Sequence, residues 1–166
     1  MTRTLIITLT ACLLSLTSIA QDSLTVDYDG FLAMTEEVES YRQSRLIPIG
    51  AWNAMSKQPN TIILDTRSKK AYDAIHIRGA VHLNFSDFTK ETLAEVIPSK
   101  DTRILIYCNN NVISNNAMFF NKFTPLALNI PTFINLYGYG YTNIYELADY
   151  LPEGYPRFDF VRGDQP

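Results

Sequence analysis

The residue best suited to do chemistry in this sequence is Cys108. It follows the apolar run 103–107, which is typical of a buried strand, and it precedes three consecutive asparagines, residues 109–111. In open α/β sheets, ligands bind beyond the carboxyl ends of the strands, and Cys108 is predicted to lie at such an end. A reactive thiolate and a buried, inert thiol are both compatible with this position.

The residues after Cys108 favour the reactive form. We predict a tight loop from Asn109 to Ile113, including Asn110, Asn111 and Val112, and then a helix that starts near Ser114. Asparagine tolerates left-handed backbone geometry, and serine is a good helix N-cap. A helix N-terminus carries partial positive charge and free amides, which would lower the thiol pKa and could hold a persulfide or an oxyanion.

Two further groups stand at predicted strand ends or turns. Asp65 ends the apolar run 61–64, and Arg67 follows two residues later. Such a carboxylate can tie down a loop through amide hydrogen bonds, and such an arginine can face an anionic ligand, although a surface pair around a turn fits the spacing equally well. His76 and His82 have no metal-ligand spacing with an acidic or cysteine cluster, so we expect no metal or other cofactor.

The elements that must position these residues alternate along the chain. Apolar runs predict strands at 61–64, 80–83, 103–107 and 144–147, and helical patterns fall at 31–45, at 68–74 after Ser68, and at 89–96. Residues 124–135 are interrupted by proline, and the tail from Pro152 is expected to be irregular. This alternation predicts an α/β domain with a mainly parallel central sheet.

Composition sets outer limits on function. The chain has 166 residues, 46% hydrophobic and 19% charged, which is typical of a single globular domain. Its net charge is −3 and it has no run of lysine or arginine, so a nucleic-acid partner is not expected.

The N-terminus has the pattern of a secretory signal peptide in residues 1–20. Arg3 precedes an apolar run, and Ser18 and Ala20 are the small residues expected before cleavage, which leaves Gln21 as the new N-terminus. A membrane anchor is the alternative, but the run is short for a span, and a lipoprotein signal at Cys12 would need a longer preceding segment. We therefore expect a periplasmic or secreted protein, with no membrane attachment after cleavage. The 146 residues that remain hold one cysteine, Cys108, and cannot form an internal disulfide.

Four stretches in order resemble the rhodanese-like (sulfurtransferase) domain family. Residues 63–67 are similar to its hydrophobic-Asp-x-Arg motif, and residues 72–80 to its Tyr…His-Ile-x-Gly-Ala motif. Residues 103–108 resemble the strand that delivers its cysteine, and residues 140–147 its Gly-Tyr-x-Asn-Val-x-x-Leu ending. The resemblance covers residues 46–151. Together with the signal pattern and the helical pattern, it divides the chain into a signal peptide (1–20), an N-terminal extension with a helix (21–45), the domain itself (46–151) and a tail (152–166).

The resemblance implies a three-layer α/β fold with a mainly parallel five-stranded sheet flanked by helices, and an early strand near residues 47–49. It also implies roles. Cys108 would accept a sulfane sulfur as a persulfide, Asp65 would brace the site, and Arg67 would lie near its mouth. His76, Gly79 and Ala80 would be structural. The partners would be a small sulfur-containing donor and a thiol acceptor, and the oligomeric state stays open.

The loop departs from the family pattern Cys-Arg-x-Gly-x-Arg-Ser. Asn111 replaces the glycine, and Asn109 and Ile113 replace the two arginines. The Gly-Gly that often follows the last strand is replaced by Ala148-Asp149. Three functions therefore compete: a sulfurtransferase, a weak or inactive module that binds a partner or small anion, and a cysteine phosphatase, which would need an arginine where Ser114 stands.

Overall fold

The computed structural model describes residues 26–156 and 158–163, so the predicted signal peptide lies outside the described residues. Helices and strands alternate along the chain, as predicted. The helices are α1 (Tyr28–Gln43), α2 (Ile49–Met55), α3 (Lys69–Ala74), α4 (Lys90–Val96) and α5 (Asn129–Gly138). The strands are β1 (Leu46–Ile47), β2 (Thr61–Asp65), β3 (Ile75–Ile77), β4 (Ala80–His82), β5 (Arg103–Tyr107), β6 (Val112–Ile113), β7 (Ile144–Leu147), β8 (Leu151–Pro152) and β9 (Phe160–Arg162). Four 3-10 turns complete the list: η1 (Phe85–Asp87), η2 (Asn109–Asn111), η3 (Ala117–Phe119) and η4 (Thr124–Leu126).

A five-stranded sheet with the order β1-β7-β5-β2-β4 forms the centre of the molecule. Every pairing in this sheet is parallel, which confirms the predicted sheet and its four predicted strands. The central strands are short continuous apolar runs because both of their faces are covered. All carboxyl ends of a parallel sheet point to one edge, and Asp65 and Cys108 are thereby brought to the same edge.

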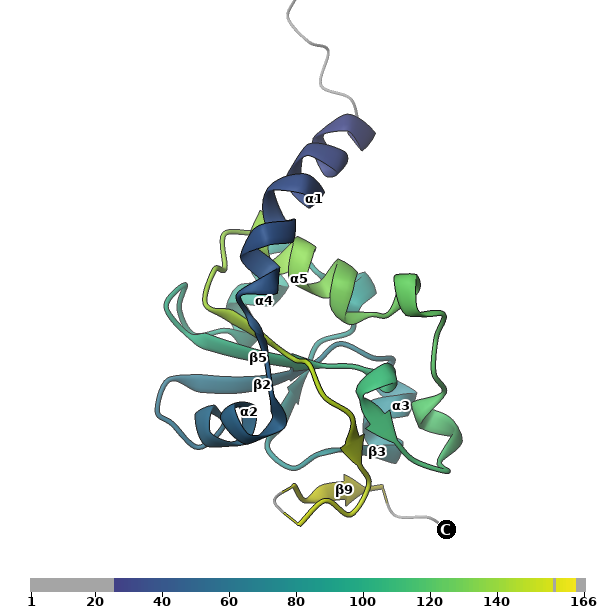
Figure 1. Cartoon of the computed structure of the whole chain (residues 1–166). Coiled ribbons are helices and arrows are strands. Elements are labelled where there is room, and N and C mark those ends of the chain that lie inside the picture. The colour runs from purple at the N-terminus through teal and green to yellow at the C-terminus, as the bar shows by residue number, and fades with distance from the viewer. Residues whose placement is uncertain (1–25, 157, 164–166) are drawn as a thin grey trace, which may run out of the picture.

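Helices cover both faces of the sheet and give the three layers (Figure 1). Alternate side chains of β5 divide the core: Ile104 and Ile106 pack with Val38 and Phe133 from α1 and α5. On the other face, Leu105 and Tyr107 pack with Trp52 from α2, and with β3. Helix α4 lies on the same face as α1 and α5 (Figure 1).

The predicted Ser68 cap is present, and a second cap, not predicted from the sequence, begins α4. The Ser68 side chain accepts a hydrogen bond from the backbone N–H of Ala71 at the start of α3. The Thr89 side chain does the same for Thr92 in α4. These caps satisfy amides that have no partner within their helices, which explains why short helices begin at these residues.

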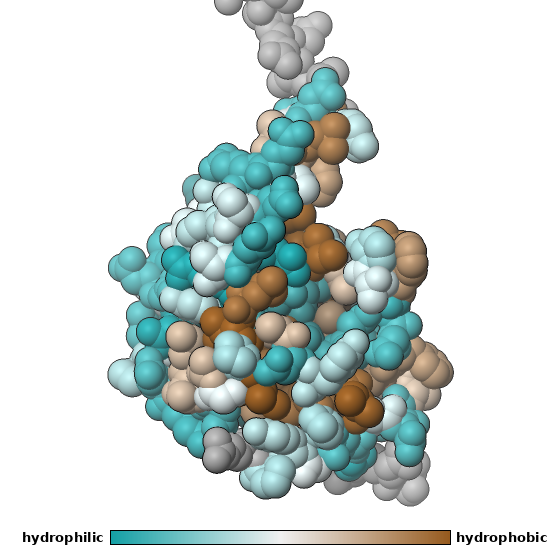
Figure 2. All heavy atoms as spheres, viewed as in Figure 1, coloured by the Kyte–Doolittle hydropathy of each residue, from teal (hydrophilic) through white to brown (hydrophobic). Residues whose placement is uncertain are grey.

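Helix α1 begins three residues earlier and ends two residues earlier than predicted, and it projects from the body (Figure 1). It begins at Tyr28, and Asp27 caps it by accepting from the backbone N–H of Gly30 at 2.8 Å. Polar residues cover the visible outer side of α1, and apolar residues gather below it (Figure 2). None of the helices in the described part of the chain is long and apolar enough to cross a membrane.

Two predictions about the ends of the domain need correction. The stretch 47–49 is not one strand, because β1 ends at Ile47 and Pro48 is the N-cap of α2, a helix that the periodicity did not indicate. The tail from Pro152 is not irregular throughout. Its strand β9 pairs antiparallel with β3, where His76 faces Val161, so the tail closes over one edge of the domain.

Candidate functional site

Cys108 lies immediately after β5 and is 1% exposed. It is the N-cap residue of the 3-10 turn η2, which the three asparagines form. The thiol is free. The sulfur is therefore closed off from solvent in this structure.

The surroundings of the sulfur act on its acidity in opposite directions. Burial raises the pKa of the Cys108 thiol, and the carboxylate of Glu146 raises it further. Hydrogen bonds from the backbone N–H groups of Asn129, Asn110 and Asn111 lower the pKa but do not outweigh burial. The predicted lowering of the thiol pKa is therefore wrong for this closed arrangement, although the predicted cup of amides is present.

The helix behind this amide cup is not the predicted one. No α-helix starts near Ser114. Instead the chain makes β6 and then the short turns η3 and η4, and α5 begins only at Asn129. Asn129 is the first residue of α5 and its N–H faces the sulfur, so the N-terminus of a helix does reach Cys108. The prediction failed because residues 112–128 form an irregular excursion between the loop and its helix.

The side chain of Asn111 fixes the loop. Its Oδ1 accepts from the backbone N–H of Cys108 at 3.0 Å and from Nδ2 of Asn129 at 2.8 Å. Its Nδ2 donates to the carbonyl of Leu147 at 2.8 Å. Asn111 therefore joins the end of β5, the start of α5 and the end of β7, a task that the glycine of the family pattern could not perform.

Asp65 and Arg67 form a buried pair rather than a surface pair. Nη2 of Arg67 lies 2.6 Å from Oδ2 of Asp65, with side chains 2% and 0% exposed. The Asp65 carboxylate also accepts from the backbone N–H of Arg67 and from the hydroxyl of Tyr107. Asp65 thus holds the turn at Arg67, and its role as a brace of the site stays a prediction. Arg67 points inward, where it donates to the carbonyl of Ile75, although part of the residue lines the hollow beside Asn109.

The two histidines and Gly79 surround the chain between α3 and β4. Nδ1 of His76 lies 2.7 Å from the carbonyl of Tyr72, and Nε2 of His82 lies 2.8 Å from the carbonyl of Arg67. Gly79 has a φ of 82°, a left-handed conformation that suits glycine in the turn before β4. In the described residues, no group of three or more His, Cys, Asp or Glu side chains could hold a metal ion.

A hollow of about 340 Å³ lies next to the loop and is lined by Asn109, Lys122 and Ser68, among others. The side-chain oxygen of Asn109 is buried and has no hydrogen-bond partner among the described residues. Asn110 holds the backbone of Lys122 in place, because its amide donates to the Lys122 carbonyl at 2.7 Å and its oxygen accepts from the Lys122 N–H at 3.0 Å. Arg67 also lines this hollow, so its wall holds two cationic residues, of which Arg67 is paired with Asp65.

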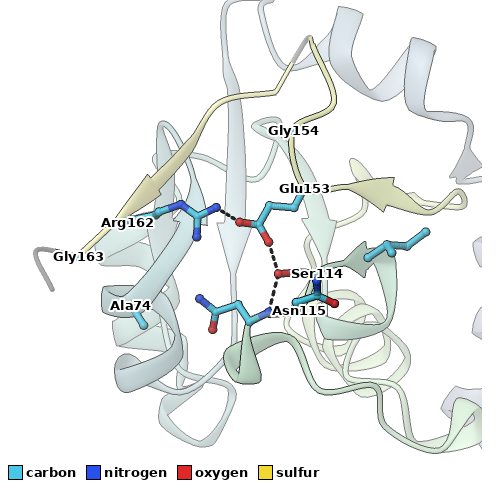
Figure 3. A pocket seen from close by; sticks show the side chains of 9 residues that line it. Ala74, Ser114, Asn115, Glu153, Gly154, Arg162 and Gly163 are labelled. Atoms are coloured by element: carbon cyan, nitrogen blue, oxygen red, sulfur yellow. Dashed lines mark hydrogen bonds and ion pairs between the residues drawn. The ribbon is translucent and has the colours of Figure 1, made fainter.

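The last residues of the predicted loop face a different cleft. Val112 is buried in β6, opposite Leu151, whereas Ile113 and Ser114 line an open cleft of about 810 Å³ (Figure 3). There the Ser114 hydroxyl donates to the carboxylate of Glu153, which also pairs with Arg162. The structure thus places Asn109 to Asn111 around Cys108 and does not bring Ser114 into that group.

The parallel sheet, its flanking helices and a cysteine at a strand end define the class of this protein as an α/β domain with a candidate thiol site. The model of the rhodanese-like domain family matches residues 50–149, and the chain belongs to this family. Similar solved structures are the BH2092 protein from Bacillus halodurans, with 17% sequence identity and a TM-score of 0.46 over 73% of this chain and 74% of that one. Protein hp1203 from Helicobacter pylori 26695 is 18% identical, with a TM-score of 0.45 over 74% of this chain and 93% of that one. A comparison with curated protein sequences finds no significant match.

Sequence reasoning missed three residues of this region. Asn129 and Glu146 both act on the sulfur, and Lys122 lines the hollow beside Asn109. Lys122 carried a signal, because it is the one charged residue between Cys108 and Tyr145 in the sequence. Asn129 and Glu146 carried none, since their approach to Cys108 depends on how α5 and β7 meet β5.

Proposed function

We propose that this protein is a sulfurtransferase that carries a sulfane sulfur as a persulfide on Cys108. The observation that carries the proposal is the set of three backbone N–H groups, from Asn110, Asn111 and Asn129, that face the sulfur. Backbone amides at a helix N-terminus stabilise sulfur anions, whether a thiolate or a persulfide. An inert cysteine in an apolar core would have no use for them.

The transfer follows from the chemistry of the thiolate. Cys108 loses its proton to solvent when the loop opens, and its thiolate attacks the outer sulfur of a donor persulfide. The new bond joins the two sulfurs, and the donor leaves as a thiolate. In the second half, an acceptor thiolate attacks the outer sulfur on Cys108, and the Cys108 thiolate is the leaving group, so no net oxidation occurs.

The charges around the site favour some donors over others. Thiosulfate is a dianion, and the loop offers it no arginine at 109 or 113, while Arg67 is already paired with Asp65. Of the two cations that line the hollow beside Asn109, Arg67 and Lys122, only Lys122 forms no ion pair with another described residue. We therefore propose an organic persulfide as the better donor and thiosulfate as the poorer one.

The intact mass of the protein tests this function. After incubation with a persulfide donor, the mass should rise by one sulfur atom, and Cys108→Ser should abolish the gain. Loading should be slow at neutral pH and should accelerate as pH rises, because burial raises the pKa of the thiol and only the thiolate attacks. A matched control is Ser114→Ala, which changes the neighbouring cleft and should load like the unaltered protein.

A binding module is the second candidate function. The burial of Cys108 and the raised pKa of its thiol favour it, as do the uncharged loop positions 109 and 113. An absence of any mass gain at high pH, with every donor and with a thiol that still titrates, would establish the module in place of the enzyme.

We also propose that the protein works outside the cytoplasm, in the periplasm or beyond. The support is the signal-peptide pattern of residues 1–20, with small residues at 18 and 20. N-terminal sequencing of the protein from its native host should begin at Gln21, and an intact Met1 would contradict export.

A further inference from the structure

We propose that Arg42 of α1 is a positioning residue for the Cys108 loop and acts through Glu146. This inference rests on the proposed function, in which Cys108 is the reacting group. Arg42 lies before residue 50, where the family match begins. The helix that carries it therefore lies outside the residues that the family model matches.

An unbroken chain of hydrogen bonds leads from Arg42 to Cys108. Nε and Nη2 of Arg42 donate to the two carboxylate oxygens of Glu146, each at 2.7 Å. Nδ2 of Asn129 lies 3.3 Å from Oε1 of Glu146 and 2.8 Å from Oδ1 of Asn111. Oδ1 of Asn111 in turn accepts from the backbone N–H of Cys108 at 3.0 Å.

The geometry of these hydrogen bonds makes the series rigid. The Arg42 pair is bidentate, which fixes the plane of the carboxylate, and the Glu146 side chain is 8% exposed. The amide of Asn129 is divided between Glu146 and Asn111, so its orientation is set by the carboxylate. The backbone N–H of Asn129 also donates to the sulfur. A shift of the Asn129 side chain would therefore change the acidity of the Cys108 thiol.

Other contacts hold α1 in place against the rest of the domain. Val38 is 1% exposed in the core beside Phe133. The hydroxyl of Tyr41 donates to the carbonyl of Thr142 at 2.6 Å. Arg42 therefore sits at the C-terminal end of a helix that is already packed on α5 and adjoins β7.

The charge of Glu146 makes the arrangement measurable. Among the described residues, Glu146 is the charged side chain that acts on the sulfur, and Arg42 is its ion-pair partner. Without Arg42, the carboxylate would face Cys108 uncompensated and would no longer be fixed, so the thiol would ionise at a higher pH. Without Glu146, the thiol would ionise at a lower pH, and Arg42 would have nothing to act through.

A double-mutant cycle read by thiol titration tests the inference. The full chain and its Arg42→Gln, Glu146→Gln and double variants are titrated by the ultraviolet absorbance of the thiolate, with Cys108→Ser subtracted to remove the tyrosines. Arg42→Gln should raise the pH midpoint of Cys108 ionisation enough to leave about threefold less thiolate at neutral pH. Glu146→Gln should lower this midpoint. In the Glu146→Gln background, Arg42→Gln should have no further effect.

Three controls keep the result interpretable. Arg42→Lys retains the charge but loses the bidentate geometry. Its pH midpoint of thiol ionisation should therefore lie close to that of the unaltered protein. Arg45→Gln is the matched variant, since Arg45 also lies near the C-terminal end of α1 but contacts the hydroxyls of Tyr41 and Tyr145. It should leave the midpoint unchanged. Thermal unfolding of each variant shows whether it is folded at the temperature of the titration.

Two outcomes would overturn the inference. One is an unchanged midpoint in folded Arg42→Gln. The other is an equal shift in both backgrounds, which would mean that Arg42 acts on Cys108 without Glu146. The titration uses no sulfur donor, so a failure of persulfide loading would leave this result intact, and a failure here would leave the sulfurtransferase proposal standing.

Discussion

Burial and hydrogen bonding compete at the Cys108 sulfur. Cys108 is 1% exposed, and burial raises the pKa of its thiol even though three backbone N–H groups face it. In this arrangement the Cys108 thiol stays neutral at neutral pH. A neutral thiol resists oxidation and metal capture, both of which need the thiolate. Burial of the sulfur therefore protects Cys108 from these reactions.

The raised pKa has a consequence for stability at alkaline pH. Unfolded chains ionise their cysteine from about pH 8.5, whereas the folded protein keeps Cys108 protonated. The unfolded state then binds fewer protons, so the free energy of unfolding falls as pH rises. The loss begins near the unfolded pKa and continues up to the folded pKa, with a slope of at most about 1.4 kcal/mol per pH unit.

Urea unfolding between pH 7.5 and about 9.5, in reducing buffer, measures this slope below the range in which tyrosines ionise. The control is Cys108→Ala, which should be less stable at neutral pH but should lose less stability as pH rises. Identical slopes in the two proteins would show that the thiol is as acidic in the folded chain as in the unfolded one.

At the scale of elements, the central strands and the short capped helices were predictable, because their signals are local. The strand at 61–64 and the helix cap at Ser68 depend only on residues that lie close to them in the sequence. The excursion 112–128, strand β9 and the approach of Asn129 to Cys108 were not predictable, because each depends on contacts between distant parts of the chain. Arg67 shows the same limit: its spacing from Asp65 was visible, but only the packing of β3 and η3 decides that it points inward.

The cap of α3 gives a prediction at this scale. Ser68→Ala removes the acceptor for the N–H of Ala71, at 3.3 Å, and should lower the free energy of unfolding by about 1 kcal/mol. Urea denaturation measures the change. Ser86→Ala is the matched control, because within the described residues the Ser86 side chain hydrogen-bonds only to the neighbouring Asp87 and caps no helix. An equal loss in both variants would mean that the cap contributes nothing specific.

On the scale of the whole molecule, segments from both ends of the chain complete the domain. Helix α1 packs on α5 at one side of the sheet, and β9 pairs with β3 at the other (Figure 1). Both lie outside residues 50–149, which the family model matches. Residues 50–149 are thus flanked by segments that pack on them, and we expect the stability of the domain to depend on these segments.

Removal of α1 tests this dependence. We compare a chain that begins at Gln21 with one that begins at Leu46. The shorter chain loses the burial of Val38, worth about 1.5–3 kcal/mol, and leaves Glu146 without its ion-pair partner. It should unfold at a clearly lower urea concentration, with a total loss above about 3 kcal/mol, which is a large share of the stability of an ordinary domain. Val38→Ala in the longer chain should lose only part of this amount. Equal unfolding midpoints for the two chains would mean that α1 rests on the domain without stabilising it.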